Sequence, residues 1–172
     1  LRFGSTPGVY GDLLDGAGRA LAALPDGILG VAPHSLRAVS RATLSRVGTM
    51  RPGGPVHIHI AEQVAEVTEV EAAWGARPVE WAVANLAVDR RWCMIHATQM
   101  SPAETRSLAR TGAAAGLCPI TEANLGDGSF DGPGWLEANG LIGIYVDGQR
   151  IATYSYTSPR EALNWQAVSF LF

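Results

Sequence analysis

Short apolar runs alternate with longer helix-like stretches along most of the chain, and this alternation limits the possible folds more than any other feature. The apolar runs, which we expect to be strands, occupy residues 28–32, 56–61, 93–97, 113–120 and 141–146. Most of them precede a stretch whose apolar residues recur at helical spacing. Near-continuous apolar strands separated by helices are typical of a parallel sheet covered on both faces. The sequence therefore predicts an α/β fold of five consecutive βα units.

The helices expected around these strands occupy residues 11–24, 35–47, 62–74, 78–88, 101–112, 135–138 and 159–172. One of them has a clear start, because Glu104 follows Ser101 at the spacing of a capping box. Residues 121–128 are polar and rich in glycine, so we expect a loop that either shapes the mouth of a site or only connects two elements. Nothing indicates a domain boundary, and residues 1–172 are interpreted as one domain.

The carboxyl ends of the predicted strands carry polar residues that distinguish two α/β architectures. An open doubly wound sheet would have a glycine-rich phosphate loop after a strand, and neither GxGxxG nor GxxxxGK[ST] occurs. Instead, His34, His59, His96 and Asp147 lie at four of the strand ends. The strand ends of a β/α barrel share one mouth, where these groups would converge. We therefore predict a partial (β/α)8 TIM-type barrel, since a complete one needs about 250 residues.

Charge and composition exclude several classes of partner. The 13 basic residues are all arginine and are scattered among 16 acidic residues, with a formal net charge of -3, so no basic patch for nucleic acid is indicated. The apolar stretches are shorter than the roughly 20 residues of a membrane span. The two cysteines are far apart and form no CxxC motif, which favours reduced thiols and a cytoplasmic location.

The run HIHIAEQ, residues 57–63, is the strongest local signal for chemistry. In a strand, His57 and His59 project from the same face, and Glu62 falls just beyond the strand end. Histidine nitrogens bind zinc, and a nearby non-ligating glutamate can transfer protons to and from a metal-bound water. The alternative is that both histidines are hydrogen-bonded inside a packed barrel.

Four further residues have a functional and a structural interpretation. His96 ends an apolar strand, where it would either join His59 at the mouth or be a satisfied core residue. Asp147 would need a partner or a metal if buried, but Asp-Gly is also a common turn dipeptide in a hairpin. His34 and Arg37 lie near the end of the first strand. Arginine suits bidentate carboxylate binding, although a surface position is its default.

The runs APHSLRAV, VHIHIAEQ, EVEAAWGARPVEW, AVDRRWCMIHAT and GAAAGLCPITEANLGDG resemble the C-terminal half of the formimidoylglutamate deiminase family, in the amidohydrolase superfamily. The resemblance covers about residues 28–143. It implies about the last five βα units of a metal-dependent (β/α)8 barrel. It also implies hydrolysis of N-formimidoyl-L-glutamate to N-formyl-L-glutamate and ammonia, a step of histidine degradation.

The resemblance also implies roles for individual residues. His59 and Asp147 would bind one zinc ion, with iron as the alternative metal, and Asp147 would also accept a proton from the attacking water. Glu62 would act as general acid and base, and His96 would stabilise the water or the substrate. His34 and Arg37 would bind the carboxylates of the substrate, formimidoylglutamate. We also consider that the protein forms a homodimer.

Two departures from the family pattern matter. The histidines at 57 and 59 correspond to the family's fifth strand, so we expect the HxH pair of the first barrel strand to lie upstream of this chain. Residues 144–172 differ from the family pattern, which makes the role of Asp147 less secure than that of His59. Two other interpretations stay open: another aminohydrolase, such as a nucleobase-type deaminase, and a non-catalytic truncated remnant.

Overall fold

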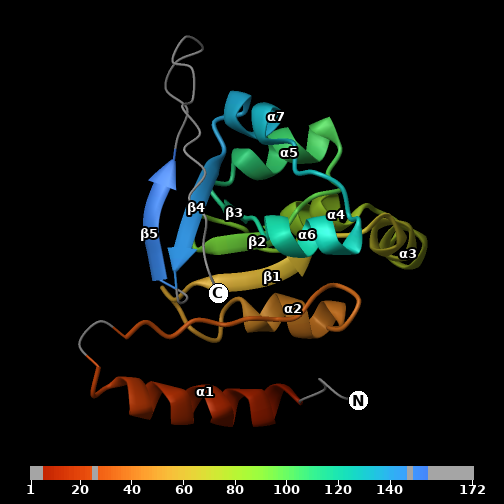
Figure 1. Cartoon of the computed structure of the whole chain (residues 1–172). Helices are drawn as coiled ribbons and strands as arrows, with labels where there is room; N and C mark the ends of the chain where they lie inside the picture. The colour runs from red at the N-terminus through yellow and green to blue at the C-terminus, as the bar shows by residue number, and fades with distance from the viewer. Residues whose placement is uncertain (1–5, 25–26, 147–148, 155–172) are drawn as a thin grey trace.

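A five-stranded sheet lies at the centre of the computed structural model, which describes residues 6–24, 27–146 and 149–154 (Figure 1). The strands are β1 (Val56–Ile60), β2 (Trp92–His96), β3 (Ala114–Gly116), β4 (Leu141–Val146) and β5 (Gln149–Tyr154). Their order in the sheet is the order of the chain, and β1 to β4 pair in parallel. A doubly wound sheet reverses its order at a switch point, whereas barrel strands follow one another. The predicted partial barrel architecture is therefore confirmed.

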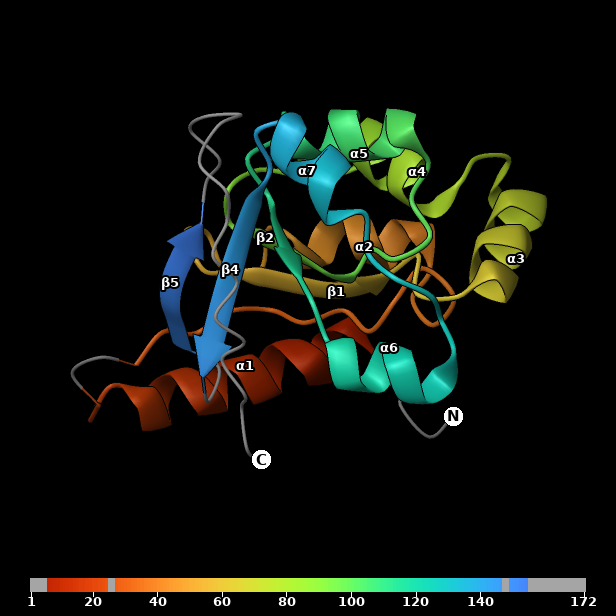
Figure 2. The same ribbon diagram turned by 45° about the horizontal axis from the view of Figure 1, so that its top comes forward.

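The helices are α1 (Pro7–Leu21), α2 (Arg41–Val47), α3 (Val64–Trp74), α4 (Pro78–Asn85), α5 (Pro102–Ala109), α6 (Pro119–Leu125) and α7 (Gly132–Glu137). Contacts link α3 to α4, α4 to α5, and α5 to α7. Figure 2 shows α5 and α7 side by side on one side of the sheet and α1 on the opposite side. The described core lies between the sheet and these helices, and Ile58, Met94 and Trp135 are fully buried in it.

Two serines determine where helices begin. Ser101 Oγ accepts a hydrogen bond from Glu104 N, and Glu104 Oε2 accepts one from Ser101 N, which confirms the predicted capping box. Ser40 caps α2 by accepting a hydrogen bond from Thr43 N at 3.3 Å. The prediction that this second helix starts near residue 35 is therefore wrong. The preceding residues form a turn, and the cap sets the start.

The first predicted strand, at residues 28–32, is present only as isolated pairing. Val31 bridges Val56 and Ser35 bridges His59, both in parallel. Pro33 lies between the two bridges and has no amide hydrogen to donate, which interrupts a continuous ladder. The strand prediction is wrong in extent, but this segment still lies along the free edge of β1.

The fourth predicted strand, at residues 113–120, ends early. Only Ala114–Gly116 is strand, because Pro119 starts α6 at the first helical position. At Gly116, an added Cβ would lie 2.6 Å from the side-chain atom Ile95 Cδ1, so a larger residue would require the neighbouring side chains on β2 to move. Residues 121–125 of the expected loop, which spans residues 121–128, belong instead to α6. This changes which residues form the site described below.

The C-terminal strands form an antiparallel pair, in which Val146 pairs with Gln149. This pairing agrees with the hairpin interpretation of VDGQRI rather than with a strand that leads directly into a helix. Asp147 itself lies outside the described residues, as does the helix expected at residues 159–172.

Candidate active site at the strand ends

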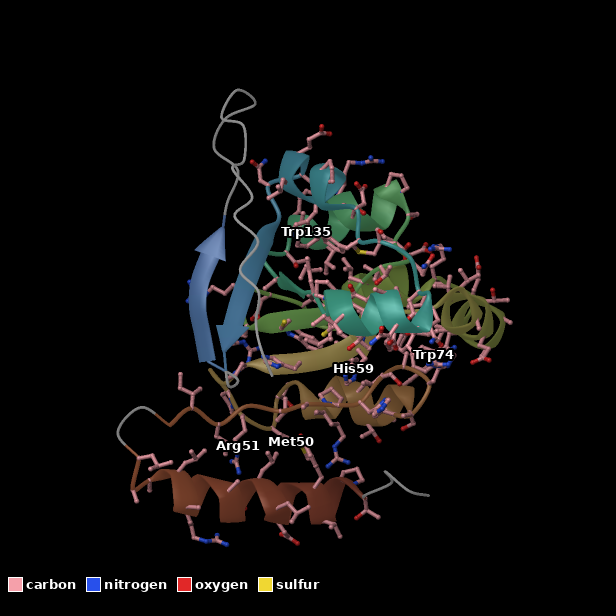
Figure 3. The ribbon with its side chains drawn as sticks, in the orientation of Figure 1. Met50, Arg51, His59, Trp74 and Trp135 are labelled. Atoms are coloured by element: carbon pink, nitrogen blue, oxygen red, sulfur yellow. The ribbon has the colours of Figure 1, made fainter. Side chains whose placement is uncertain are left out.

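Three predicted site histidines lie side by side at the carboxyl ends of β1 and β2. These strands are parallel, with Ile60 opposite His96 in the register. The ring of His96 stacks on that of His59, with 5.6 Å between centroids and 27° between planes. On its other side, the His59 ring lies 5.1 Å from the ring of His34. Figure 3 shows His59 at this end of the sheet, where α6 crosses in front.

The backbone bends sharply where both strands end. Ala61, His96 and Ala97 have positive φ angles of 50°, 70° and 51°. Such angles are uncommon for residues other than glycine, and they cluster at functional sites. Hydrogen bonds from Ala97 N to Ile60 O and from Gln99 N to Ala61 O tie the two bends together. The cross-strand bonds therefore hold the geometry that presents the two histidine rings.

His59 has one ring nitrogen occupied and one available. Its Nδ1 lies 2.9 Å from the carbonyl oxygen of His34. A carbonyl only accepts, so Nδ1 carries the hydrogen and Nε2 of the neutral ring keeps its lone pair. A backbone carbonyl on the second nitrogen is the usual support of a metal-binding histidine. His59 is exposed, so Nε2 is sterically accessible to a ligand.

His96 is buried between two carboxylates. Its Nε2 lies 3.3 Å from Glu62 Oε1, and its Nδ1 lies 3.1 Å from Glu122 Oε1. A carboxylate oxygen accepts, so the hydrogen bond to Glu122 places a hydrogen on Nδ1. The contact between Nε2 and Glu62 has the length of an ion pair, which forms when the ring is protonated. This arrangement can hold and transfer a proton at the site facing Glu62.

Sequence analysis did not identify Glu122 as a site residue, because its segment was expected to be a loop. Glu122 is 4% exposed, and its Oε1 also accepts a hydrogen bond from Cys118 N at 2.9 Å. The available signal was Pro119, which starts a helix and places an acidic residue in the first turn. Recognising that start would have placed Glu122 in the first turn of a helix rather than in a loop.

The thiol of Cys118 lies in the same cluster. Burial raises the pKa of this thiol, and the negative charges of Glu122 and Glu62 raise it further. His96, Cys118 and Glu122 each offer a ligand atom within 4.8 Å of the others. However, Glu122 Oε1 already accepts hydrogen bonds from His96 and from Cys118 N. We therefore interpret these three residues as a hydrogen-bonded cluster.

Glu66 is another buried carboxylate that sequence analysis missed. It is 2% exposed and lies in the first turn of α3. Its Oε1 accepts a hydrogen bond from Ala61 N at 3.0 Å, and its Oε2 accepts one from Glu62 N at 2.9 Å. Glu66 therefore fixes the backbone turn that carries Glu62.

The other predicted residues are placed as follows. His34 and Arg37 are exposed, and the Arg37 guanidinium lies 3.7 Å from Glu69 on α3. A contact of this length between exposed groups is weak. His57 shares a face of β1 with His59 but is half-buried, and burial lowers its pKa. The side chain of His57 is therefore more buried than that of His59, which lies nearer the end of the strand.

A network of hydrogen bonds holds the loops near the site in place. Arg77 donates to Glu104 Oε2 at 2.7 Å and to the carbonyl oxygen of Gln99 at 2.6 Å. Glu104 is 3% exposed and also accepts from Glu80 N at 3.2 Å. The Gln99 side chain donates to the carbonyl oxygen of Asp127, beyond α6. These bonds join the loop after β2 to the loop after α6.

Within residues 6–24, 27–146 and 149–154, no helix is both long and apolar enough to cross a membrane. No family model matches the chain. A formimidoylglutamate deiminase from Pseudomonas aeruginosa is 50% identical over 123 residues, which are 69% of this chain and 26% of that protein.

Two solved structures have the same fold over most of the chain. An amidohydrolase from Brucella melitensis is 49% identical, with a TM-score of 0.80 over 84% of this chain and 32% of that one. An adenosine deaminase from Xanthomonas campestris, with bound zinc, is 27% identical, with a TM-score of 0.65 over 73% and 30%. The chain thus spans only about a quarter to a third of the length of these proteins. These similarities identify the chain as a relative of formimidoylglutamate deiminase with the fold of part of an amidohydrolase barrel.

Proposed function

We propose that this chain is part of a metal-dependent enzyme that hydrolyses N-formimidoyl-L-glutamate to N-formyl-L-glutamate and ammonia. The observation that carries the proposal is the cluster of His59, Glu62 and His96 at the strand ends. It occurs in a chain that is 50% identical to a formimidoylglutamate deiminase over 69% of its length. Water adds to the formimidoyl carbon. The bond between that carbon and the terminal nitrogen then breaks, and ammonia is released.

The donor chemistry of His59 fits a divalent metal. Its Nδ1 is tied to the His34 carbonyl, which orients Nε2 as a ligand. We propose Asp147 as a second ligand, with the others supplied by the rest of the complete protein. Bound zinc in the Xanthomonas campestris adenosine deaminase favours zinc over iron. The metal, when bound, lowers the pKa of water toward about 7 and so supplies hydroxide at neutral pH.

Glu62 is the proposed proton donor to the departing nitrogen. Its carboxyl oxygen Oε1 lies 3.3 Å from His96 Nε2, and its backbone amide is held by a hydrogen bond to Glu66. A proton transfer by a positioned group is worth about 10²–10⁴-fold in rate. His96 stabilises the attacking water, and Asp147 accepts the proton that the water loses.

His34 and Arg37 are the proposed recognition residues for the substrate's carboxylates. Both are exposed near the strand ends, and the His34 ring contacts that of His59. The weak contact of Arg37 with Glu69 leaves its guanidinium available to pair with an anion. This charge preference favours an acidic substrate over a neutral nucleoside.

A nucleoside deaminase is the second candidate, supported by the likeness to the adenosine deaminase. The two can be separated with a chimera in which residues 28–143 replace the matching segment of the Pseudomonas aeruginosa relative. We expect ammonia release from formimidoylglutamate and none from adenosine. Release from adenosine alone would refute the proposal.

A non-catalytic role makes a different prediction for the chimera, which also contains the other proposed ligands. Zinc content of the purified chimera addresses it directly. Bound zinc that is lost in a His59→Gln variant supports the proposed site, whereas a chimera that binds no zinc favours the non-catalytic alternative. The homodimer and the cytoplasmic location stay predictions.

A further inference from the structure

We propose that Glu122 is a positioning residue that sets which ring nitrogen of His96 carries the hydrogen in the neutral ring. The proposal deepens the proposed function, because its catalytic consequence rests on His96 acting there. Glu122 itself does not touch the site of reaction: it acts through the imidazole from the side opposite Glu62.

The carboxylate of Glu122 is built into the structure at a defined position. It is 4% exposed, and its Oε1 accepts both His96 Nδ1 at 3.1 Å and Cys118 N at 2.9 Å. The helix that carries it begins at Pro119 and ends at Gly126, whose φ of 71° suits the end of a helix. The carboxylate of Glu122 is held by two hydrogen-bond donors and by a short helix. It therefore cannot easily move with the His96 ring if that ring rotates.

The contact determines the tautomer of the neutral ring. A carboxylate acceptor at Nδ1 requires the hydrogen on that nitrogen, which leaves the lone pair on Nε2. Nε2 of the neutral ring then presents its lone pair on the side of Glu62, whose Oε1 lies 3.3 Å away. Without Glu122, the hydrogen would be free to move to Nε2, which would then donate to Glu62 instead. Nε2 would then have no lone pair with which to take up a proton on the side of Glu62.

The sequence of contacts is therefore Cys118 N to Glu122, Glu122 to His96, and His96 to Glu62. The four residues lie at different places in the fold: the start of α6, α6 itself, the end of β2, and the turn after β1. This explains why a residue on a segment that resembles a polar loop is buried at all.

Nuclear magnetic resonance of the 172-residue chain tests the proposal without requiring turnover. The chain has four histidines, so long-range ¹H–¹⁵N spectra of ¹⁵N-histidine-labelled protein are simple, and a His96→Gln variant assigns the signal. In metal-free buffer at alkaline pH, we expect His96 Nδ1 to carry a proton. A neutral His96 with the hydrogen on Nε2 and a bare Nδ1 would overturn the proposal.

Two variants of similar shape separate positioning from packing. Glu122→Gln keeps an acceptor for Nδ1, so we expect the wild-type tautomer. Glu122→Met removes the acceptor, so we expect the hydrogen to move to Nε2. Retention of the Nδ1 hydrogen in a folded Met variant, or its loss in the Gln variant, would contradict the proposal. If the Met variant does not fold, the wild-type and Gln spectra still decide.

The two proposals fail in different ways. A chimera that releases no ammonia from formimidoylglutamate refutes the proposed function but leaves the tautomer result unchanged. An active chimera combined with a bare Nδ1 in the labelled chain refutes the role of Glu122 alone.

Discussion

The imidazole rings of His59 and His96 stack at the ends of neighbouring strands, with their centroids 5.6 Å apart. The contact follows from the parallel register of β1 and β2, which places Ile60 opposite His96. Positive φ angles at Ala61 and His96 then bend both chains at the same level. The arrangement of the two rings is therefore a property of the sheet, and α6 adds the carboxylate of Glu122 that contacts the His96 ring.

The turn that carries Glu62 depends on Glu66. In a Glu66→Gln variant, one carboxylate oxygen becomes an amide donor that faces the amide hydrogen of Ala61 or Glu62. We expect the free energy of unfolding to fall by about 1–3 kcal/mol. Urea denaturation measures the change. Glu69→Gln is the matched control on the same helix, and it should change stability by less than about 0.5 kcal/mol. Equal effects of the two variants would contradict the role of Glu66.

The bond between Arg77 and Glu104 stabilises the loop after β2. An Arg77→Met variant leaves the buried carboxylate of Glu104 with fewer donors, so we expect a loss of about 1–3 kcal/mol in urea denaturation. The control is Arg91→Met, which breaks a more exposed pair with Asp89 and should cost no more than about 1 kcal/mol. The prediction is wrong if the control variant is the less stable of the two.

The thiol of Cys118 should react slowly. Burial and the charges of Glu122 and Glu62 raise its pKa, so less thiolate is present at a given pH. In a Cys93→Ala background, we expect the pH midpoint of iodoacetamide alkylation to lie above the usual cysteine range. Adding Glu122→Gln removes one negative charge and should lower that midpoint. A midpoint that does not move would show that Glu122 does not act on the thiol.

The half-buried ring of His57 should make stability depend on pH. Burial lowers its pKa in the folded chain, so the unfolded chain binds the proton more readily. Stability from this residue is fully present above the unfolded pKa of about 6.5 and decreases as the pH falls toward the folded pKa. Relative to a His57→Gln variant, the wild type should lose stability in that window. A constant difference in unfolding free energy across the window would contradict the prediction.

The sequence was sufficient to predict the parallel arrangement and the convergence of His34, His59 and His96, because both depend on strand order and strand ends. It was insufficient for residues 28–32, where Pro33 interrupts the pairing despite an apolar run. Burial on both faces favours apolar runs, but hydrogen bonding decides where a strand continues.

The carboxylates of Glu66 and Glu122 show a second limit of sequence analysis. Each was read as part of an ordinary helix or loop, since acidic residues are usually exposed. They are buried because backbone amides and an imidazole satisfy them. The amides come from the residues just before each helix, whereas the imidazole of His96 comes from a distant segment that only the folded chain brings to Glu122. The role of Asp147 stays a prediction.

The central claim is that Glu62 and its neighbours at the strand ends carry out deimination. The most direct measurement is kcat for ammonia release from formimidoylglutamate by the chimera that contains residues 28–143, compared with its Glu62→Gln and Glu69→Gln variants. We predict a fall of about 10²–10⁴-fold for Glu62→Gln and wild-type turnover for Glu69→Gln. Unchanged turnover in Glu62→Gln would contradict the account.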